Sequence, residues 1–375
     1  MIAKALQALS ALLTRRIAFE VDLIPLEFRD LPLKKIVNWL LTEGSVYVKP
    51  ARPWGRPTLL QVEPTSRCNL LCQVCPVRTG MDRARGDMDF GLFRRLIDEL
   101  GDYLLVIMFW DWGEPFLHAQ AYEMIHYART HGIRVVASTN GHVFAAGDHA
   151  RRVVESGLDV LVFSVDGITE ESYQHYRSAG RLEQVVAGIR RVVEERRRLG
   201  SRTPLVNFRF IVMGHNEHEV PQVGAFARDL GVDALTLRKF HAVPHFRWDP
   251  AAEHHRLLPS QAKYQLPIIC PQDYRPVRIR RNPCKNLWNC AAIHWDGTVC
   301  SCFMDFEERR PLGRLSERSF MEIWAGEAYR SVRRAFRKHW QQVPLCGECA
   351  FGFEGGDVGR AANAEAVFFP GREGP

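Results

Sequence analysis

The chain has 375 residues, of which 46% are apolar, and its 50 basic and 43 acidic side chains leave a formal net charge of +7. This length suits two or three domains, or one large barrel with additions, and the apolar content is ordinary for a globular core. The charge excess is too small to indicate nucleic-acid binding. The longest clear apolar run, Leu104 to Trp110, is far shorter than the roughly 20 residues of a membrane span.

Residues 1–57 are predicted to form a helical extension before the first strand. Ile2, Leu6, Leu9 and Leu13 recur at helical spacing, and an Arg-Arg pair follows them. Polar residues interrupt this stretch, which is unlike the apolar region of a signal peptide. We expect an amphipathic helix that docks on the rest of the protein, with contact to a membrane surface through residues 1–16 as the alternative.

Residues 58–240 alternate short β-rich runs with helical patterns. The runs are Leu59–Glu63, Leu104–Trp110, Arg134–Ser138, Asp159–Ser164, Leu205–Met213 and Ala234–Leu237. The clearest apolar stripe of helical period runs from Leu182 to Val193. Six β–α units in series predict an α/β fold with a parallel sheet and helices outside it. Six units are too few to close an eight-stranded barrel.

Three cysteines follow the first of these runs. Cys68, Cys72 and Cys75 have the spacing C-x3-C-x2-C, and no fourth cysteine lies nearby. Three thiolates can hold three irons of a [4Fe–4S] cube and leave the fourth iron open to a substrate or cosubstrate. A zinc site, which normally presents four ligands, and a disulfide framework, which suits short secreted chains, are the alternatives. The spacing favours the iron–sulfur cluster.

This triplet resembles the signature of radical S-adenosylmethionine (SAM) enzymes. The resemblance covers about residues 58–350 and implies a partial (β/α)6 TIM-like barrel with a [4Fe–4S] cluster. In this family the open iron binds SAM, and one electron from the cluster breaks a sulfur–carbon bond. Short motifs at the ends of the predicted strands support the resemblance, because the chemistry of such barrels gathers at the C-terminal ends of the strands.

The second strand is followed by a candidate SAM-binding motif. Gly113, Glu114 and Pro115 are similar to the GGEP motif of the family, which holds the SAM amino group. Trp112 stands where the first glycine of that motif is usual, so the backbone is expected to sit differently there. Val74 stands where the family often has an aromatic residue near the adenine, before the third cysteine.

Four further residues are implied as SAM contacts. Ser138 ends the third strand, Ser164 ends the fourth, and Asn216 follows the fifth. Ser164 resembles a family residue near the SAM ribose or carboxylate. Arg177 is implied as a partner of the SAM carboxylate, since a guanidinium fork matches a carboxylate well. A surface arginine and residues that only shape turns are the alternatives.

A second group of cysteines lies near the C-terminus. Cys284, Cys302, Cys346 and Cys349 resemble the ligands of the auxiliary iron–sulfur extension of radical SAM enzymes, called SPASM in its long form and twitch in its short form. The resemblance implies one auxiliary [4Fe–4S] cluster within residues 284–352, with a four-cysteine zinc ribbon as the alternative. The run Ile293–Val299 predicts a β-hairpin with an Asp-Gly turn.

The remaining cysteines and segments are less informative. Cys290 and Cys300 do not fall on the pattern, and buried free thiols are expected. Cys300 is a candidate hydrogen donor, and Cys270 stands alone. Residues 241–283 are proline-rich and predict a connector across the barrel mouth. Residues 353–375 predict a loosely ordered tail.

Together these features predict an enzyme that cleaves SAM to a 5′-deoxyadenosyl radical and takes a hydrogen atom from its substrate. A small polar metabolite is the expected substrate, undergoing oxidation or epimerisation of the oxidoreductase or isomerase type. A peptide-modifying maturase is the alternative within the enzyme class, and a non-catalytic iron–sulfur electron-transfer or binding protein is the alternative outside it. The expected reductant is a flavodoxin or ferredoxin. Iron–sulfur chemistry needs a reducing compartment, so we expect a cytoplasmic protein.

Overall fold

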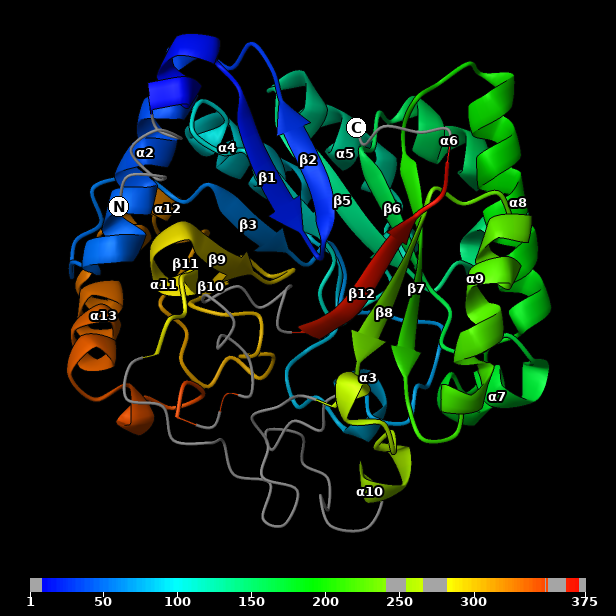
Figure 1. Cartoon of the computed structure of the whole chain (residues 1–375). Helices are drawn as coiled ribbons and strands as arrows, with labels where there is room; N and C mark the ends of the chain where they lie inside the picture. The colour runs from blue at the N-terminus through cyan, green and yellow to red at the C-terminus, as the bar shows by residue number, and fades with distance from the viewer. Residues whose placement is uncertain (1–8, 241–253, 266–281, 348, 350–361, 371–375) are drawn as a thin grey trace.

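A curved sheet of ten strands runs through the part of the chain that the computed structural model describes, which is residues 9–240, 254–265, 282–347, 349 and 362–370 (Figure 1). Its central strands are parallel and follow chain order. They are β3 (Leu59–Val62), β4 (Val106–Phe109), β5 (Arg134–Thr139), β6 (Val160–Ser164), β7 (Leu205–Val212) and β8 (Ala234–Lys239). Each falls on a run that the sequence predicts, and the partial α/β barrel is confirmed.

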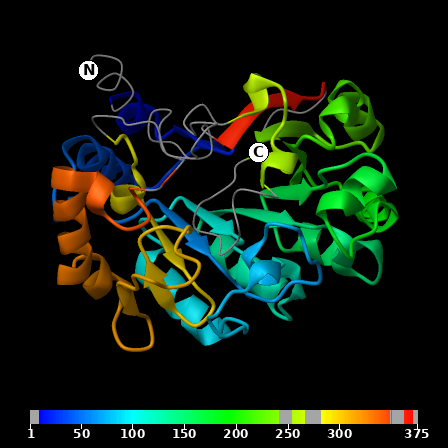
Figure 2. The ribbon, with the colours of Figure 1, turned by 90° about the horizontal axis from the view of Figure 1, so that it is seen from below.

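Helices return the chain from one strand to the next on the outer side of this sheet (Figures 1 and 2). They are α4 (Phe90–Leu100), α5 (Ala121–Thr130), α6 (His149–Glu155), α7 (Glu170–Tyr176), α8 (Leu182–Arg198) and α9 (Val220–Asp229), whereas the short helix α3 (Pro76–Thr79) lies in the loop after β3. Alternate residues of each strand face these helices, so that Leu60, Phe163 and Phe208 share one buried apolar cluster with Phe93 of α4 and Ile189 of α8.

A β-hairpin covers part of the inner face of the sheet. It consists of β1 (Ile17–Val21) and β2 (Ile24–Phe28), which pair antiparallel and pack with Val106, Val136 and Val160 in a second apolar cluster. The prediction of a wholly helical N-terminal extension is therefore wrong over residues 17–28. Helix α2 (Leu33–Val48) follows the hairpin, and residues 1–8 of the predicted amphipathic helix lie outside the described residues.

The C-terminal region extends the same sheet at both edges. Strand β9 (Cys290–Ile293) pairs parallel with β3, and β10 (Thr298–Cys300) and β11 (Gly313–Arg314) follow it antiparallel. The predicted hairpin is confirmed, with Gly297 in the left-handed region at its turn. Helices α11 (Asn286–Asn289), α12 (Phe320–Trp324) and α13 (Glu327–His339) complete this region.

The other edge is covered by the end of the chain. Strand β12 (Asn363–Phe368) pairs antiparallel with β8, so the prediction of a loosely ordered tail is wrong for these residues. The connector predicted across the barrel mouth lies largely outside the described residues, which include only α10 (His254–Leu257) and residues up to 265 within it. The parallel order of β3 to β8 places all their C-terminal ends at one rim, where the predicted motifs lie.

Candidate functional site

The three cysteines of the first motif lie in the loop that leaves β3 and enters α3. Two backbone hydrogen bonds tie this loop to the end of α7: the Leu71 N–H donates to the Ser178 carbonyl (3.0 Å), and the Gln73 N–H donates to the Tyr176 carbonyl (3.0 Å). Within the loop, the Cys75 N–H donates to the Cys72 carbonyl (3.1 Å). The loop is thus held against the rim of the barrel by its own backbone.

The three thiols influence one another and lie in an apolar setting. Burial raises the pKa of Cys68 to about 11 and also raises the pKa of Cys72 and Cys75, and neighbouring thiols add to the shift at Cys68 and Cys75. Thiolates are therefore unfavourable here unless a cation accompanies them. The irons of a cluster would supply that positive charge, so these residues fit a cluster with three protein ligands.

Glu114 is the buried carboxylate of the neighbouring strand end. Its Oε1 accepts from Thr139 Oγ1 (2.8 Å), and its Oε2 accepts from the backbone N–H of Asn140 (2.7 Å). Only 2% of Glu114 is exposed, and burial raises the pKa of its carboxyl to about 7. No ion pair of Glu114 is found within the described residues, so a buried ammonium group would find a matching partner here.

Two neighbours place Glu114 beside the cysteine loop. The Glu114 N–H donates to the Arg67 carbonyl (2.8 Å), next to Cys68 in the chain. The Asn140 side-chain amide approaches the sulfur of Cys68 at 3.9 Å while its backbone N–H holds Glu114. Sequence reasoning did not assign these supporting roles to Thr139 and Asn140, although both stand at the end of a predicted strand.

Gly113 allows the chain to pass closely over the residues before the first cysteine. A Cβ atom at this position would lie 2.0 Å from the carbonyl oxygen of Thr65 and 2.9 Å from that of Arg67. Both neighbours are backbone atoms and cannot move aside easily. Pro115 follows Glu114 at the start of a 3-10 turn (Pro115–Leu117) and is buried. The motif is therefore a tight backbone turn that aims one carboxylate at the barrel rim.

Ser138 and Ser164 are neighbours on the inner face of the barrel. Their hydroxyl oxygens lie 3.3 Å apart, on β5 and β6 respectively. Both are half-buried, and Ser164 is the register partner of Arg209 on β7. The structure thus brings two of the predicted SAM-contact residues together, on the rim that also carries Glu114.

Arg177 and Asn216 are engaged within the protein. The Arg177 guanidinium forms a buried ion pair with Asp166 and approaches the sulfur of Cys72 at 3.9 Å. The Asn216 amide group donates to the carbonyls of Asp166 and Ile211, each at 3.0 Å. Asp166 itself has a positive φ of 54°. In this structure both residues support the turn at Asp166, and their contact with SAM stays a prediction.

Trp112 links the candidate SAM-binding motif to the C-terminal region. Its indole N–H donates to the carbonyl of Phe303 (3.2 Å), and its ring packs edge-on against Phe306 at 5.3 Å. A glycine at this position would make neither contact. Val74 is buried in a separate apolar cluster that includes Tyr176.

The four cysteines of the second motif are close to one another. Burial raises the pKa of Cys302, and the thiols of Cys349, Cys284 and Cys346 raise it further. Burial likewise raises the pKa of Cys346, as do Cys284 and Cys349. The Lys49 ammonium donates to the carbonyl of Cys284 (3.2 Å), which fixes the start of this region against α2. Four gathered thiols fit a cluster with four protein ligands.

A site for a single metal ion differs in geometry from a site for an iron–sulfur cube. Within the residues that the structure describes, no three His, Cys, Asp or Glu side chains are gathered so as to hold one metal ion. A cube takes one thiolate per iron, and its ligands surround four metal atoms in place of one. Cys290 and Cys300 are buried on β9 and β10, as the sequence predicts for free thiols, and Cys270 lies outside the described residues.

Comparison with known proteins gives two family matches, and they fall on these two sites. The model of the radical SAM superfamily matches residues 62–227, and the model of an iron–sulfur cluster-binding domain, SPASM, matches residues 284–350. The chain therefore contains a radical SAM domain followed by a SPASM domain. Its cofactors are accordingly [4Fe–4S] clusters and SAM.

Relatives of known name cover most of this radical SAM protein. The tungsten-containing aldehyde ferredoxin oxidoreductase cofactor-modifying protein of Pyrococcus furiosus is 24% identical over 320 residues, which is 78% of this chain and 86% of that protein. An AdoMet-dependent heme synthase of Methanosarcina barkeri is 27% identical over 325 residues, 79% of this chain and 89% of that protein.

The fold is shared with a solved radical SAM structure. SuiB of Streptococcus suis bound to S-adenosylmethionine superposes with a TM-score of 0.57 at 12% identity, covering 78% of this chain and 72% of that chain. This likeness supports the partial barrel and its C-terminal extension. None of the helices in the described part of this radical SAM protein has the length and apolarity that crossing a bilayer requires.

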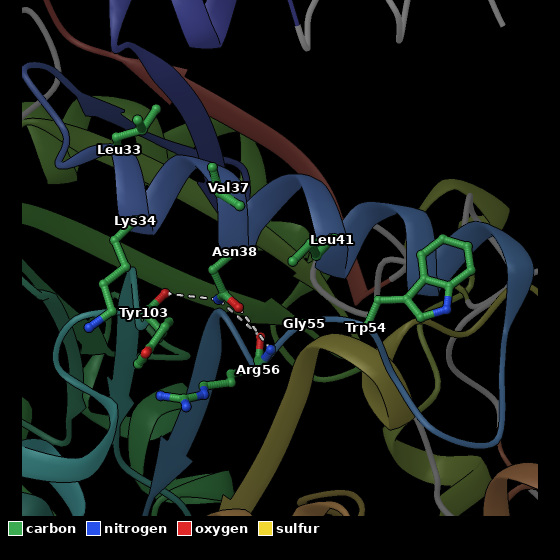
Figure 3. A pocket seen from close by; sticks show the side chains of 9 residues that line it. All are labelled: Leu33, Lys34, Val37, Asn38, Leu41, Trp54, Gly55, Arg56 and Tyr103. Atoms are coloured by element: carbon green, nitrogen blue, oxygen red, sulfur yellow. Dashed lines mark hydrogen bonds between the residues drawn. The ribbon is translucent and has the colours of Figure 1, made fainter.

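A groove on the outer side of the molecule lies apart from the predicted site residues. It has a volume of about 420 Å³ and runs along α2 (Figure 3). Leu33, Val37 and Leu41 of α2 line one side, and Arg56 and Tyr103 lie opposite them. Asn38 closes its floor through hydrogen bonds to the carbonyls of Arg56 and Tyr103, each at 3.2 Å. None of the predicted cluster ligands or SAM contacts lines this groove.

Proposed function

We propose that this protein reductively cleaves SAM and abstracts a hydrogen atom from a small polar metabolite. The observation that carries the proposal is the placement of Glu114, a buried carboxylate without an ion pair among the described residues, beside the three-cysteine loop. That arrangement suits a cosubstrate that has an ammonium group and also binds an iron. The cluster supplies the electron and SAM supplies the radical; the protein supplies binding and orientation.

Different residues at the rim hold the first cluster and bind SAM. Cys68, Cys72 and Cys75 hold the first cluster, and Glu114 accepts hydrogen bonds from the SAM ammonium. Gly113 permits the backbone approach that brings Glu114 to the cysteine loop, and Pro115 stiffens the turn after it. Asn140 keeps the carboxylate aimed at this position through its backbone N–H.

The inner face of the barrel provides the other contacts. Ser138 and Ser164 present adjacent hydroxyl groups for the SAM ribose or carboxylate, and Arg177 and Asn216 hold the Asp166 turn behind them. The Arg177 guanidinium already pairs with Asp166. To contact the SAM carboxylate as well, it has to divide its N–H groups between the two carboxylates. A second cluster held by Cys284, Cys302, Cys346 and Cys349 accepts or donates an electron, or helps to position the substrate.

The named relatives support a small-molecule substrate. The Pyrococcus protein modifies a cofactor and the Methanosarcina protein makes heme, and each matches this chain over more than three quarters of its length. A peptide substrate remains the alternative, as SuiB has also been solved with its precursor peptide, with a TM-score of 0.57 at 11% identity. That likeness concerns the fold only. We expect a flavodoxin or ferredoxin as the physiological reductant.

SAM cleavage tests this function without knowledge of the substrate. The full chain, reconstituted with iron and sulfide under anoxic conditions, is mixed with dithionite and SAM, and 5′-deoxyadenosine is quantified by chromatography. We expect 5′-deoxyadenosine from the wild-type protein and only background from Cys68→Ala, because two thiolates cannot hold the cluster and leave its fourth iron free for SAM. Equal background amounts from both proteins would favour the non-catalytic iron–sulfur protein.

A further inference from the structure

A second group of charged side chains lies at the same rim of the barrel, on the side of β9. Glu63 follows β3, Asp111 follows β4 and His294 follows β9. The Glu63 N–H donates to the carbonyl of Ile293 (2.8 Å), so Glu63 and His294 continue the register of the parallel pair β3–β9. None of these residues belongs to the predicted SAM contacts or cluster ligands.

Most of the polar atoms in this group have partners. Arg83 forms a two-pronged ion pair with Glu63, at 2.5 and 2.8 Å. The Nδ1 atom of His294 lies 3.0 Å from Oε1 of Glu308, and Oδ1 of Asp111 accepts from the Gln61 amide at 3.0 Å. Because an ionised carboxylate only accepts, the bond to Glu308 places a proton on Nδ1 of His294. The neutral ring then has its lone pair on Nε2.

Two atoms in the group lack a partner. Within the described residues, Oδ2 of Asp111 and Nε2 of His294 make no hydrogen bond, although both are buried. They face each other at 3.7 Å, too far apart for a direct hydrogen bond, and the two side chains are 3% and 0% exposed. Burying a polar atom without a partner is costly, and two such atoms face to face indicate a site that gains and loses a proton.

The surrounding charges favour holding that proton. Burial raises the pKa of Asp111, and the carboxylate of Glu63 raises it further. The positive charges of His294 and Arg83 lower it, but the net shift is upward. Burial lowers the pKa of His294, but Glu308, Glu63 and Asp111 outweigh burial and the opposing charge of Arg83, so the net shift is upward. Arg314 faces the group from β11 through Glu308, at 3.6 Å. The charge of each of the two groups therefore shifts the pKa of the other.

This pair lies between the two cofactor regions. Asp111 stands two residues before Gly113 of the SAM-binding motif. Glu308, the partner of His294, belongs to the loop that starts at Cys302, where the Asp305 N–H donates to the Cys302 carbonyl (3.1 Å) and the Glu308 N–H donates to the Asp305 carbonyl (3.0 Å). The loop from Cys302 to Glu308 thus connects the proton site at His294 with the region that would hold the second cluster.

We propose that Asp111 and His294 share one exchangeable proton whose binding is coupled to the charge of the auxiliary cluster that Cys284, Cys302, Cys346 and Cys349 would hold. This inference rests on the proposed function. The site needs no contact with a substrate, because Nε2 of His294 faces Oδ2 of Asp111 and both atoms are buried. Reduction of the cluster would add one negative charge nearby, and the pair would then hold its proton more tightly.

A purely structural role would leave a different signature. If the network only ties the barrel to the C-terminal region, removing its titratable groups changes stability and nothing else. If Asp111 and His294 hold a proton near the auxiliary cluster, an added electron raises their proton affinity, and by linkage the reduction potential of that cluster depends on pH. The test therefore measures the potential of the auxiliary cluster by redox titration with electron paramagnetic resonance (EPR), at several pH values between about 6 and 9.

The full chain with both clusters is compared with Asp111→Asn, His294→Gln and Glu307→Gln. Glu307 lies in the same loop as Glu308 and accepts from the Asp82 N–H, so its variant removes one nearby negative charge without touching the pair. We expect the wild-type potential to fall as pH rises, the two pair variants to lose this dependence, and Glu307→Gln to keep it. Iron content confirms that each variant retains both clusters.

A wild-type potential that does not change with pH would overturn the proposal, even if a variant fails to fold. So would a pH dependence that survives in both pair variants, or one that Glu307→Gln also loses. SAM cleavage by the same wild-type preparation separates the two proposals. Cleavage with a pH-independent potential removes this inference alone, whereas absence of cleavage removes the proposed function.

Discussion

Replacing Glu114 with glutamine is expected to weaken SAM binding by about a hundredfold or more and to suppress 5′-deoxyadenosine formation accordingly. The carboxylate is buried and would pair with a single ammonium group, and removing one member of a buried charge pair typically costs roughly 3 kcal/mol or more. Glutamine also turns one acceptor into a donor, which opposes the backbone N–H of Asn140 or the hydroxyl of Thr139. Equilibrium binding of SAM to the reconstituted protein measures the loss.

Glu99→Gln is the matched control for this prediction. The Glu99 carboxylate also accepts two hydrogen bonds, from the backbone N–H groups of Phe320 (2.9 Å) and Met321 (2.8 Å) at the start of α12. Like Glu114→Gln, the Glu99→Gln variant removes one negative charge and replaces one acceptor of a backbone N–H. No predicted SAM contact lies at this position. We expect Glu99→Gln to bind SAM as the wild type does. Wild-type affinity in Glu114→Gln would contradict the assigned role of Glu114.

Replacing Cys346 with alanine is expected to remove the auxiliary cluster and leave the first one in place. The reconstituted protein should then hold about four irons per chain, compared with about eight in the wild type, since each cube contains four. The physical reason is that the thiols of Cys284, Cys302, Cys346 and Cys349 are near one another, since Cys284 and Cys349 raise the pKa of both Cys302 and Cys346. Without Cys346 one iron of the cube has no protein ligand, and no SAM contact is predicted here to bind it instead. Iron and sulfide analysis with EPR of the reduced protein measures the change.

Cys290→Ala provides the comparison for this second prediction. Cys290 is a buried thiol. Burial raises its pKa, and the nearby thiol of Cys284 raises it further, yet Cys290 falls outside the proposed ligand set. We expect Cys290→Ala to retain about eight irons. If Cys290→Ala lost the auxiliary cluster while Cys346→Ala kept it, the ligand set inferred from the cysteine pattern would be wrong.

The strands of the barrel could be predicted because their signal is local. Runs such as Leu205–Val212 are rich in apolar side chains and buried on both faces, and each is followed by a turn or a motif. The Cys68 triplet and Glu114 were found in the same way, since their spacing along the chain is itself the pattern. Parallel order then brings their strand ends to one rim without further information.

Other features depend on contacts that a local pattern does not contain. The hairpin β1–β2 turns at Asp22 and Leu23, both with positive φ, where a glycine or asparagine would have signalled a turn. Strand β12 is defined by its pairing with β8, far away in the sequence. The approach of Asp111 to His294 likewise arises only because β9 joins the sheet beside β3.

The open iron beside Glu114 is the central claim, and the EPR spectrum of the reduced first cluster tests it most directly. The spectrum of the anoxically reconstituted full chain is recorded with and without SAM. Binding of SAM to the fourth iron changes the electronic structure of the cluster, so we expect the signal to change in the wild-type protein and much less in Glu114→Gln at the same SAM concentration. Superimposable wild-type spectra with and without SAM would contradict the account.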